Sequence, residues 1–180
     1  TNPGGVAIDA EGNVYAAELN DGHIYKITPD GTTTAFAAVT SSGKKSIVIV
    51  GDDMYIAYSS LEKITKVDMN NPAGGEQDFV TTGLYGGPQY MVAKDNSLYV
   101  SLFGTNKIVQ INLSNSTVSD YVTGTDFPYG IAFNSEGALF IANYYSNSLS
   151  KFENGVLTSN IVSLGHGPTG IQLDASNNIY

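Results

Sequence analysis

Few residues of this chain belong to the types that carry covalent or metal chemistry. The chain has no cysteine and two histidines, His23 and His166, which excludes thiolate zinc sites and a three-histidine zinc site within these 180 residues. No Gly-x-Ser-x-Gly segment and no spaced Ser, His and Asp set provides an activated nucleophile. Residues 83–87 are glycine-rich but lack the lysine and following helix of a phosphate-binding loop.

Aromatic side chains are the other group able to form a site. The chain contains 12 Tyr and 7 Phe, and a tyrosine offers a large apolar face with a polar tip. Such side chains at a rim would suit a sugar, a peptide or a protein loop. The binding residues that we predict are Tyr58, Phe103, Tyr129, Tyr144 and Tyr145, while some of their neighbours Tyr85, Tyr90 and Phe127 would pack between strands.

Composition and charge limit the classes of partner. With 42% hydrophobic residues, the chain can bury a core as one domain over residues 1–180. Its 17 acidic and 8 basic residues give a formal net charge of −9, with no run of Lys or Arg. A nucleic-acid partner is not expected, because phosphate binding needs clustered cations. No apolar stretch approaches the roughly 20 residues of a membrane span.

A short apolar motif with an aromatic second position repeats along the chain. These aromatic residues stand 40, 44, 41 and 40 residues apart, at Tyr15, Tyr55, Tyr99, Phe140 and Tyr180. A period of this length, with alternating apolar and polar residues inside it, is typical of propeller blades. The sequence therefore predicts an all-β propeller built from four-stranded antiparallel blades.

When the repeats are aligned on the aromatic residue, which we call the aromatic column, two further recurring positions, or columns, are evident. A Pro-x-Gly-like entry opens most repeats, with Lys44, Lys45 and Ser46 replacing it in the second; proline belongs at the start of a strand because it donates no hydrogen bond. Polar residues then mark tight turns. The turn at residues 9–13 alternates three oxygen donors, as a calcium loop would, but the pattern recurs elsewhere without carboxylates and lacks a distal bidentate Glu. A turn is the favoured interpretation.

The columns divide the chain into four complete blades and part of a fifth. The blades span about 3–40, 45–84, 88–125 and 128–165, and 168–180 is partial. Both ends supply the same strands of a blade, so they cannot complete one another. We therefore expect a segment of a longer chain, six-bladed by analogy, or a second copy that supplies the missing strands.

Residues 14–31, VYAAELNDGHIYKITPDG, resemble an NHL repeat. The whole chain is similar to the superfamily of gluconolactonase-type and regucalcin-type propellers, and the resemblance covers every repeat. It implies a six-bladed architecture. It implies activity less directly, because that superfamily includes lactonases, lyases and binding scaffolds.

The resemblance also implies a set of candidate site residues. Gluconolactonase-like enzymes hold a divalent metal with Glu, Asn and Asp side chains, and the matching positions here carry Glu18 and Asn143. A bound metal, calcium or magnesium, would use that pair. His166 precedes Gly167 and Pro168 at an entry to the same face. By similarity to streptogramin-opening lyases, His166 is the candidate catalytic residue, acting as a general base.

Two functional hypotheses follow. The first is a non-catalytic scaffold without a cofactor, which binds a protein or a small neutral ligand at the channel mouth. The alternative is a metal-dependent hydrolase or lyase of the gluconolactonase-like type. A composition with few Lys and many Ser, Thr, Asn and Tyr favours a secreted, periplasmic or lumenal protein. Two glycosylation triplets, at 112–114 and 115–117, are compatible with export.

Overall fold

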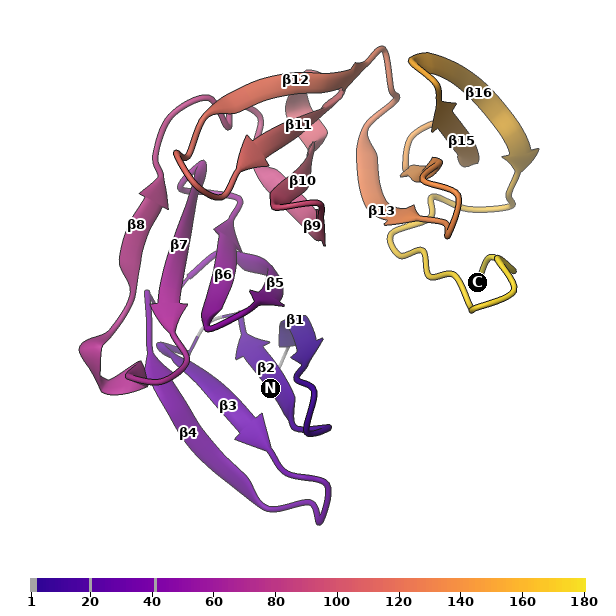
Figure 1. Cartoon of the computed structure of the whole chain (residues 1–180). Helices are drawn as coiled ribbons and strands as arrows, with labels where there is room; N and C mark the ends of the chain where they lie inside the picture. Colours follow the sequence, from indigo (N-terminus) through magenta and orange to yellow (C-terminus); the bar gives the residue numbers. More distant parts are fainter. Residues whose placement is uncertain (1–2, 20, 41) are drawn as a thin grey trace. The chain divides into compact units, whose positions relative to one another are not determined.

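The computed structural model describes residues 3–19, 21–40 and 42–180. The regular elements in this part of the chain are β-strands and two single-turn 3-10 helices (Figure 1). Contacts divide the chain into two compact units, Thr1–Pro88 and Gln89–Tyr180. A single domain over residues 1–180 stays a prediction.

The first unit contains two four-stranded antiparallel sheets, β1-β2-β3-β4 and β5-β6-β7-β8. Their elements are β1 (Pro3–Ile8), β2 (Val14–Glu18), β3 (His23–Ile27), β4 (Thr33–Ala38), β5 (Lys44–Val50), β6 (Asp53–Tyr58), β7 (Lys63–Asp68), η1 (Pro72–Gly74) and β8 (Gln77–Val80).

The second unit contains two more, β9-β10-β11-β12 and β13-β14-β15-β16. Their elements are β9 (Pro88–Lys94), β10 (Ser97–Leu102), η2 (Phe103–Thr105), β11 (Lys107–Asn112), β12 (Val118–Thr123), β13 (Pro128–Phe133), β14 (Leu139–Asn143), β15 (Ser148–Glu153) and β16 (Val156–Ser163). The prediction of all-β, four-stranded antiparallel sheets is confirmed.

The entry column has a structural counterpart in the strand register. Pro3 pairs with Glu18, Lys44 with Tyr58, and Pro128 with Asn143, and each pair is followed by a register shift. An irregularity at this point bends the first strand away from its partner. Lys44 therefore occupies the place that proline holds in the other two repeats.

Two glycines of the entry column lie close to the backbone of the next repeat. A Cβ on Gly130 would lie 2.9 Å from the backbone nitrogen of Ile171, and one on Gly5 would lie 2.9 Å from that of Ile47. Distances this short leave no room for a side chain. The glycines thus allow the first strand of one repeat to lie against the entry of the next.

Each unit buries its own apolar core between its sheets. Tyr15, Met54 and Ile56 belong to the core of the first unit, and Tyr99 and Ile131 belong to that of the second. The aromatic residues of the repeat are buried at these places, with 2% of Tyr15 and 6% of Tyr99 exposed. This explains the aromatic column, because burying such a large apolar surface stabilises the fold.

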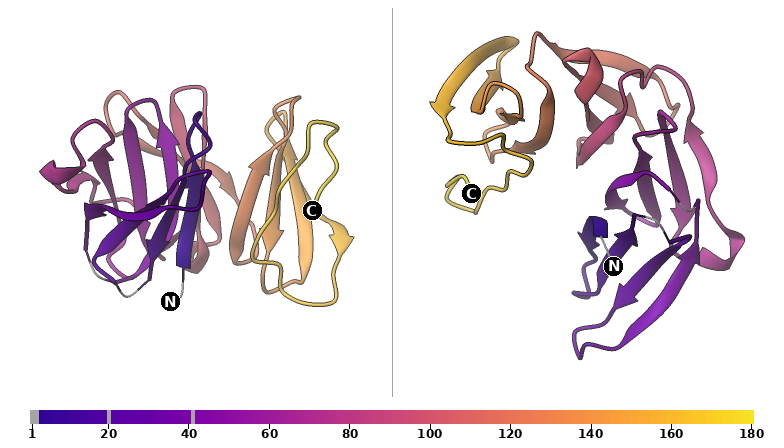
Figure 2. Two further views of the ribbon diagram at one scale, coloured as in Figure 1. Left: turned by 90° about the horizontal axis from the view of Figure 1, so that it is seen from below. Right: turned by 180° about the vertical axis from the view of Figure 1, so that it is seen from behind.

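The partial fifth repeat follows β16 within the second unit. Its backbone folds back on itself, with the Gln172 amide donating to the Tyr180 carbonyl at 3.0 Å and the reverse bond at 2.9 Å. Ile171 is 2% exposed and joins Ala142 and Leu149 in a small core. Figures 1 and 2 show this segment running beside β13.

Candidate functional site

An aromatic cluster forms at loops of the second unit. It consists of Phe103 in η2, Phe127 and Tyr129 at the entry to β13, and Tyr144 and Tyr145 after β14. The Phe103 ring centroid lies 4.9, 5.9 and 6.0 Å from those of Phe127, Tyr129 and Tyr144. The Tyr145 ring contacts the Phe127 ring, and their centroids lie 5.0 Å apart. All these separations fall in the range of favourable aromatic pairs.

The aromatic cluster has a packed base and an exposed rim. Phe103, Phe127 and Tyr129 are partly buried, whereas Tyr144 is 42% and Tyr145 70% exposed. Burial raises the pKa of the Tyr129 hydroxyl, with a further contribution from Tyr144. That phenol therefore stays protonated near neutral pH.

The backbone at Phe127 is held in an uncommon conformation. Its φ of 51° is left-handed, which for a bulky residue stores on the order of 1–3 kcal/mol. The Phe127 amide donates to Asn106 Oδ1 at 2.9 Å, and its carbonyl accepts from the Tyr144 amide at 3.1 Å. The Thr125 amide also donates to the Asn106 carbonyl, at 3.2 Å. These bonds hold the loop so that the Phe127 ring is fixed within the aromatic cluster.

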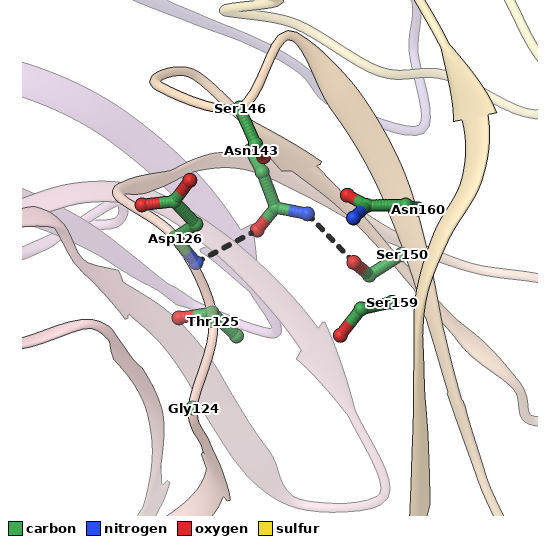
Figure 3. A pocket seen from close by; sticks show the side chains of 8 residues that line it. All are labelled: Gly124, Thr125, Asp126, Asn143, Ser146, Ser150, Ser159 and Asn160. Atoms are coloured by element: carbon green, nitrogen blue, oxygen red, sulfur yellow. Dashed lines mark hydrogen bonds between the residues drawn. The ribbon is translucent and has the colours of Figure 1, made fainter.

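Asn143, the predicted metal ligand, is a buried link in the same region. Its side chain is 2% exposed. Oδ1 accepts from the Asp126 amide at 3.1 Å, and Nδ2 donates to Ser150 Oγ at 2.7 Å (Figure 3). The side chain therefore connects the loop before β13 (residues 124–127), which we call the entry loop, to β15. Its role as a metal ligand remains a prediction.

A small pocket of about 160 Å³ adjoins this link. Figure 3 shows the residues that surround it, which come from the loop before β13, from β14 and the loop after it, and from β15 and β16. The lining residues are Gly124, Thr125, Asp126, Asn143, Ser146, Ser150, Ser159 and Asn160. We call it the Thr125 pocket, because Thr125 Oγ1 is buried and has no hydrogen-bond partner in the described part of the chain.

The remaining predicted residues lie in other surroundings. Tyr58 belongs to the core of the first unit and is 0% exposed, so it lines no open surface there. Glu18 ends β2 in the same unit and is partly buried. Glu18 belongs to the first unit and Asn143 to the second. Within residues 3–19, 21–40 and 42–180, no three His, Cys, Asp or Glu side chains gather as a metal site would require.

His166 is exposed and directly precedes Gly167 in the loop after β16. Its neighbour Gly167 lies against Tyr144, since a Cβ on Gly167 would be 2.6 Å from the Tyr144 carbonyl oxygen. The structure thus brings four of the predicted binding residues together with the loop that carries the predicted catalytic residue. It places Tyr58 and Glu18 in the other unit.

The first unit contains a partly buried ionic network that sequence reasoning missed. Glu76 accepts hydrogen bonds from the Thr40 amide at 2.7 Å, from the Thr40 hydroxyl, from Tyr58 at 2.7 Å and from Thr65 at 2.9 Å. Lys44 is 0% exposed, and its Nζ donates to the carbonyls of Asp21 at 2.6 Å and Thr40 at 2.8 Å.

The pKa values of this network follow from burial and pairing. Burial would raise the pKa of Glu76, but its hydrogen bonds with Thr40, Tyr58 and Thr65 lower it below its ordinary value. Burial lowers the pKa of Lys44 against the opposing charges of Glu76 and Asp21. Burial, and then the bond to Glu76, raise the pKa of Tyr58. The hydrogen bonds of the network thus connect loops and strands of the first unit to one another.

A smaller titratable cluster lies on the loop between β2 and β3. Asp21 accepts from Tyr25 at 2.5 Å and pairs with His23 Nδ1 at 2.7 Å. The bonds from Tyr25 and then His23 lower the pKa of Asp21. His23 therefore has a surface hydrogen-bonding role in this loop.

Comparisons with known proteins identify the fold. No family model and no curated protein matches the sequence. Among solved structures, virginiamycin B lyase from Staphylococcus aureus matches with a TM-score of 0.80 and 19% identity, over 99% of this chain and 62% of that one. A streptogramin B lyase matches with a TM-score of 0.81 and 18% identity, over 98% of this chain and 60% of that one. A chain of a nidogen–laminin complex matches with a TM-score of 0.80 and 16% identity, over 93% of this chain and 66% of that one.

These likenesses establish the architecture alone, because every identity is below 25%. The four sheets match part of a six-bladed propeller, which confirms the predicted fold class. The chain spans less than two thirds of the two lyases that it resembles. In the described residues, no helix is long and apolar enough to cross a bilayer.

Proposed function

We propose that this chain carries a non-catalytic binding site for a neutral ligand with a flat apolar face, formed by the aromatic cluster. The observation that supports it most is the strained Phe127 backbone, fixed by Asn106 and Tyr144 beneath an exposed aromatic rim. Backbone strain persists only where the surroundings over-determine it, and it gathers at ligand sites. A ring positioned in advance also reduces the entropy lost on binding.

The chemistry of the rim favours a neutral ligand. Tyr144 and Tyr145 offer rigid amphipathic surface with few rotatable bonds. The aromatic cluster and the Thr125 pocket contain one carboxylate, Asp126, and neither Lys nor Arg. The net charge of −9 disfavours anions further. A protein partner would present a neutral side chain to the same rim, and the nidogen–laminin complex is one example of this fold in a protein assembly.

Binding of neutral planar amides to the chain tests this proposal. Indole-3-acetamide and 4-hydroxyphenylacetamide should show saturation transfer from the protein in NMR experiments. Tyr145→Ala should weaken both by about tenfold, since a buried aromatic contact contributes on the order of 1–2 kcal/mol. Tyr85→Ala is the matched control, because Tyr85 is 67% exposed and lies outside the aromatic cluster. Equal binding by wild type and both variants would refute the proposed site.

The alternative is a metal-dependent hydrolase or lyase. It is favoured by the fold shared with two lyases and by the close approach of Gly167, the residue after His166, to Tyr144. In that function, Glu18 and Asn143 would hold calcium or magnesium through oxygen atoms, and His166 would accept a proton. The metal would supply Lewis-acid activation of the substrate.

Calcium and magnesium titrations distinguish the two functions. Under the alternative, calorimetry detects a bound ion, and Glu18→Gln weakens its binding at least tenfold because a carboxylate ligand loses its charge. Glu11→Gln is the control, since Glu11 is an exposed acid in a turn. Binding that is absent, or equal in both variants, eliminates the alternative.

A further inference from the structure

The Thr125 pocket and the aromatic cluster are built from the same two loops. In the entry loop, Asp126 lines the pocket and the next residue, Phe127, belongs to the aromatic cluster. In the loop after β14, Tyr145 contacts Phe127 and the next residue, Ser146, lines the pocket. A ligand that rests on the rim can therefore extend one end into the pocket.

The pocket is lined with neutral hydrogen-bonding groups. Its hydroxyls and amides can both donate and accept, and Asp126 adds a carboxylate acceptor. Ser150 accepts from Asn143, which leaves its own O–H available to donate. Asn160 accepts from Ser148 at 2.7 Å, which leaves its amide N–H groups as donors. Such a mixture matches alcohol groups, each of which donates once and accepts twice.

Thr125 gives the pocket an unsatisfied group. Its hydroxyl is buried without a partner in the described residues, and a buried polar group left without a partner destabilises a fold. Rotation about χ1 to another staggered position can bring the threonine hydroxyl to the place of its methyl group. The hydroxyl can therefore turn to a ligand that enters the pocket.

The size of the pocket indicates what part of a ligand it holds. A volume of about 160 Å³ is below the roughly 300 Å³ at which sites for whole drug-sized ligands begin. It equals several times the roughly 30 Å³ of one water molecule in the liquid. The pocket thus fits the hydroxyl-bearing edge of a ring, and the rest of the ligand lies on the aromatic cluster.

We infer that the two features form one carbohydrate-binding site. A pyranose places its apolar C–H face on Tyr145 and Phe127, and its hydroxyls bond to Thr125, Ser159 and Asp126 in the Thr125 pocket. A sugar is the class of neutral molecule that joins a flat apolar face to a fringe of hydroxyls. This inference rests on the proposed binding function and adds the class of ligand.

The test compares glycosides with planar amides on the same protein. The probes are methyl β-D-glucopyranoside, methyl β-D-galactopyranoside and methyl α-D-mannopyranoside, with indole-3-acetamide as the probe that lacks ring hydroxyls. At least one glycoside should bind, as measured by saturation-transfer NMR and calorimetry. Tyr145→Ala should weaken the binding of that glycoside and of the amide alike.

Two pocket variants separate the sugar from the amide. Thr125→Val keeps the shape of the side chain and removes the unpartnered hydroxyl, so the urea midpoint of unfolding should not fall. The same change should weaken the glycoside about threefold to tenfold, the value of one or two hydrogen bonds, and leave the amide unchanged. Ser159→Ala should act similarly, with Ser163→Ala as the control on the same exposed strand.

The possible results discriminate between the two proposals. Glycoside binding that falls in Thr125→Val and Ser159→Ala but not in Ser163→Ala supports the inference. Amide binding without any glycoside binding overturns it and leaves the proposed function standing. Glycoside binding unchanged by both pocket variants also overturns it. No binding of any probe overturns both.

Discussion

The two units use one repeat position in opposite ways. In the first unit, Tyr58 ends the second strand of its sheet, is fully buried and donates to Glu76. In the second, Asn143 stands at the matching place, holds the entry loop through Asp126 and leaves an aromatic rim exposed beside it. In the first unit the charged side chains are thus bonded to other protein groups, whereas the second unit leaves neutral groups able to bond to a ligand.

This difference shows how one architecture separates stability from binding. The ionic network around Glu76 satisfies its polar groups within the protein. Buried charges of this kind leave little capacity for a ligand, because each partner is already bonded. The Thr125 pocket instead retains an unpartnered hydroxyl and several neutral donors. Function is therefore expected in the second unit.

The largest effect should come from opening the ionic network. Glu76→Ala leaves the buried hydroxyls of Tyr58 and Thr65 without their acceptor, and should lower the free energy of unfolding by about 2–5 kcal/mol. Asn143→Ala removes two neutral hydrogen bonds in the second unit and should lower it by about 1–3 kcal/mol. Urea unfolding measures both. A larger loss from Asn143→Ala would reverse the comparison.

A glycine pair sharpens the comparison within one repeat column. Gly130→Ala would force its Cβ against the backbone of Gly170 and Ile171, at 2.9 Å, and should destabilise by about 1–3 kcal/mol through overpacking. Gly170→Ala meets nothing within 4 Å and should change stability by less than about 0.5 kcal/mol. Thermal melts of both variants decide the matter. A comparable loss from Gly170→Ala would mean that a further element packs there.

The smallest effect is a pH dependence specific to the first unit. The pKa of Glu76 in the fold lies below its ordinary 4.5, because its hydrogen bonds outweigh burial. Its contribution is therefore complete above about pH 4.5 and is lost as the pH falls through the lowered value. As the pH falls from about 4.5 through the lowered value, Glu76→Gln should therefore lose stability less steeply than wild type. If the melting temperatures of wild type and Glu76→Gln fell equally from pH 7 to pH 3, this assignment would be contradicted.

The fold could be predicted from the sequence because the repeats of the chain can be aligned with one another. The aromatic column marks buried second-strand positions such as Tyr15 and Tyr99, and the entry glycines mark close backbone approaches such as that at Gly130. Both signals arise from local requirements of one strand. Four-stranded sheets could therefore be predicted residue by residue.

The candidate site could be predicted only in part. Phe103, Tyr144 and Tyr145 directly follow strand ends, and Tyr129 is the second residue of β13; an aromatic rim is expected at such positions. Tyr58 falls at an equivalent strand end, but Glu76, 18 residues further on, draws its hydroxyl inward.

The Thr125 pocket gave no sequence signal of its own. Two of its residues, Ser159 and Asn160, come from β16, an outer strand without a motif. Tertiary pairing decided these cases, and a single sequence does not contain that information.

A nitrogen-15 NMR titration with indole-3-acetamide tests the central claim most directly. The account predicts chemical-shift changes in amides of the second unit at residues 103–106, 125–129 and 143–146, with residues 58–76 of the first unit unchanged. Shifts confined to the loops around Tyr58 and Glu76, or no shifts at saturating probe, would contradict it.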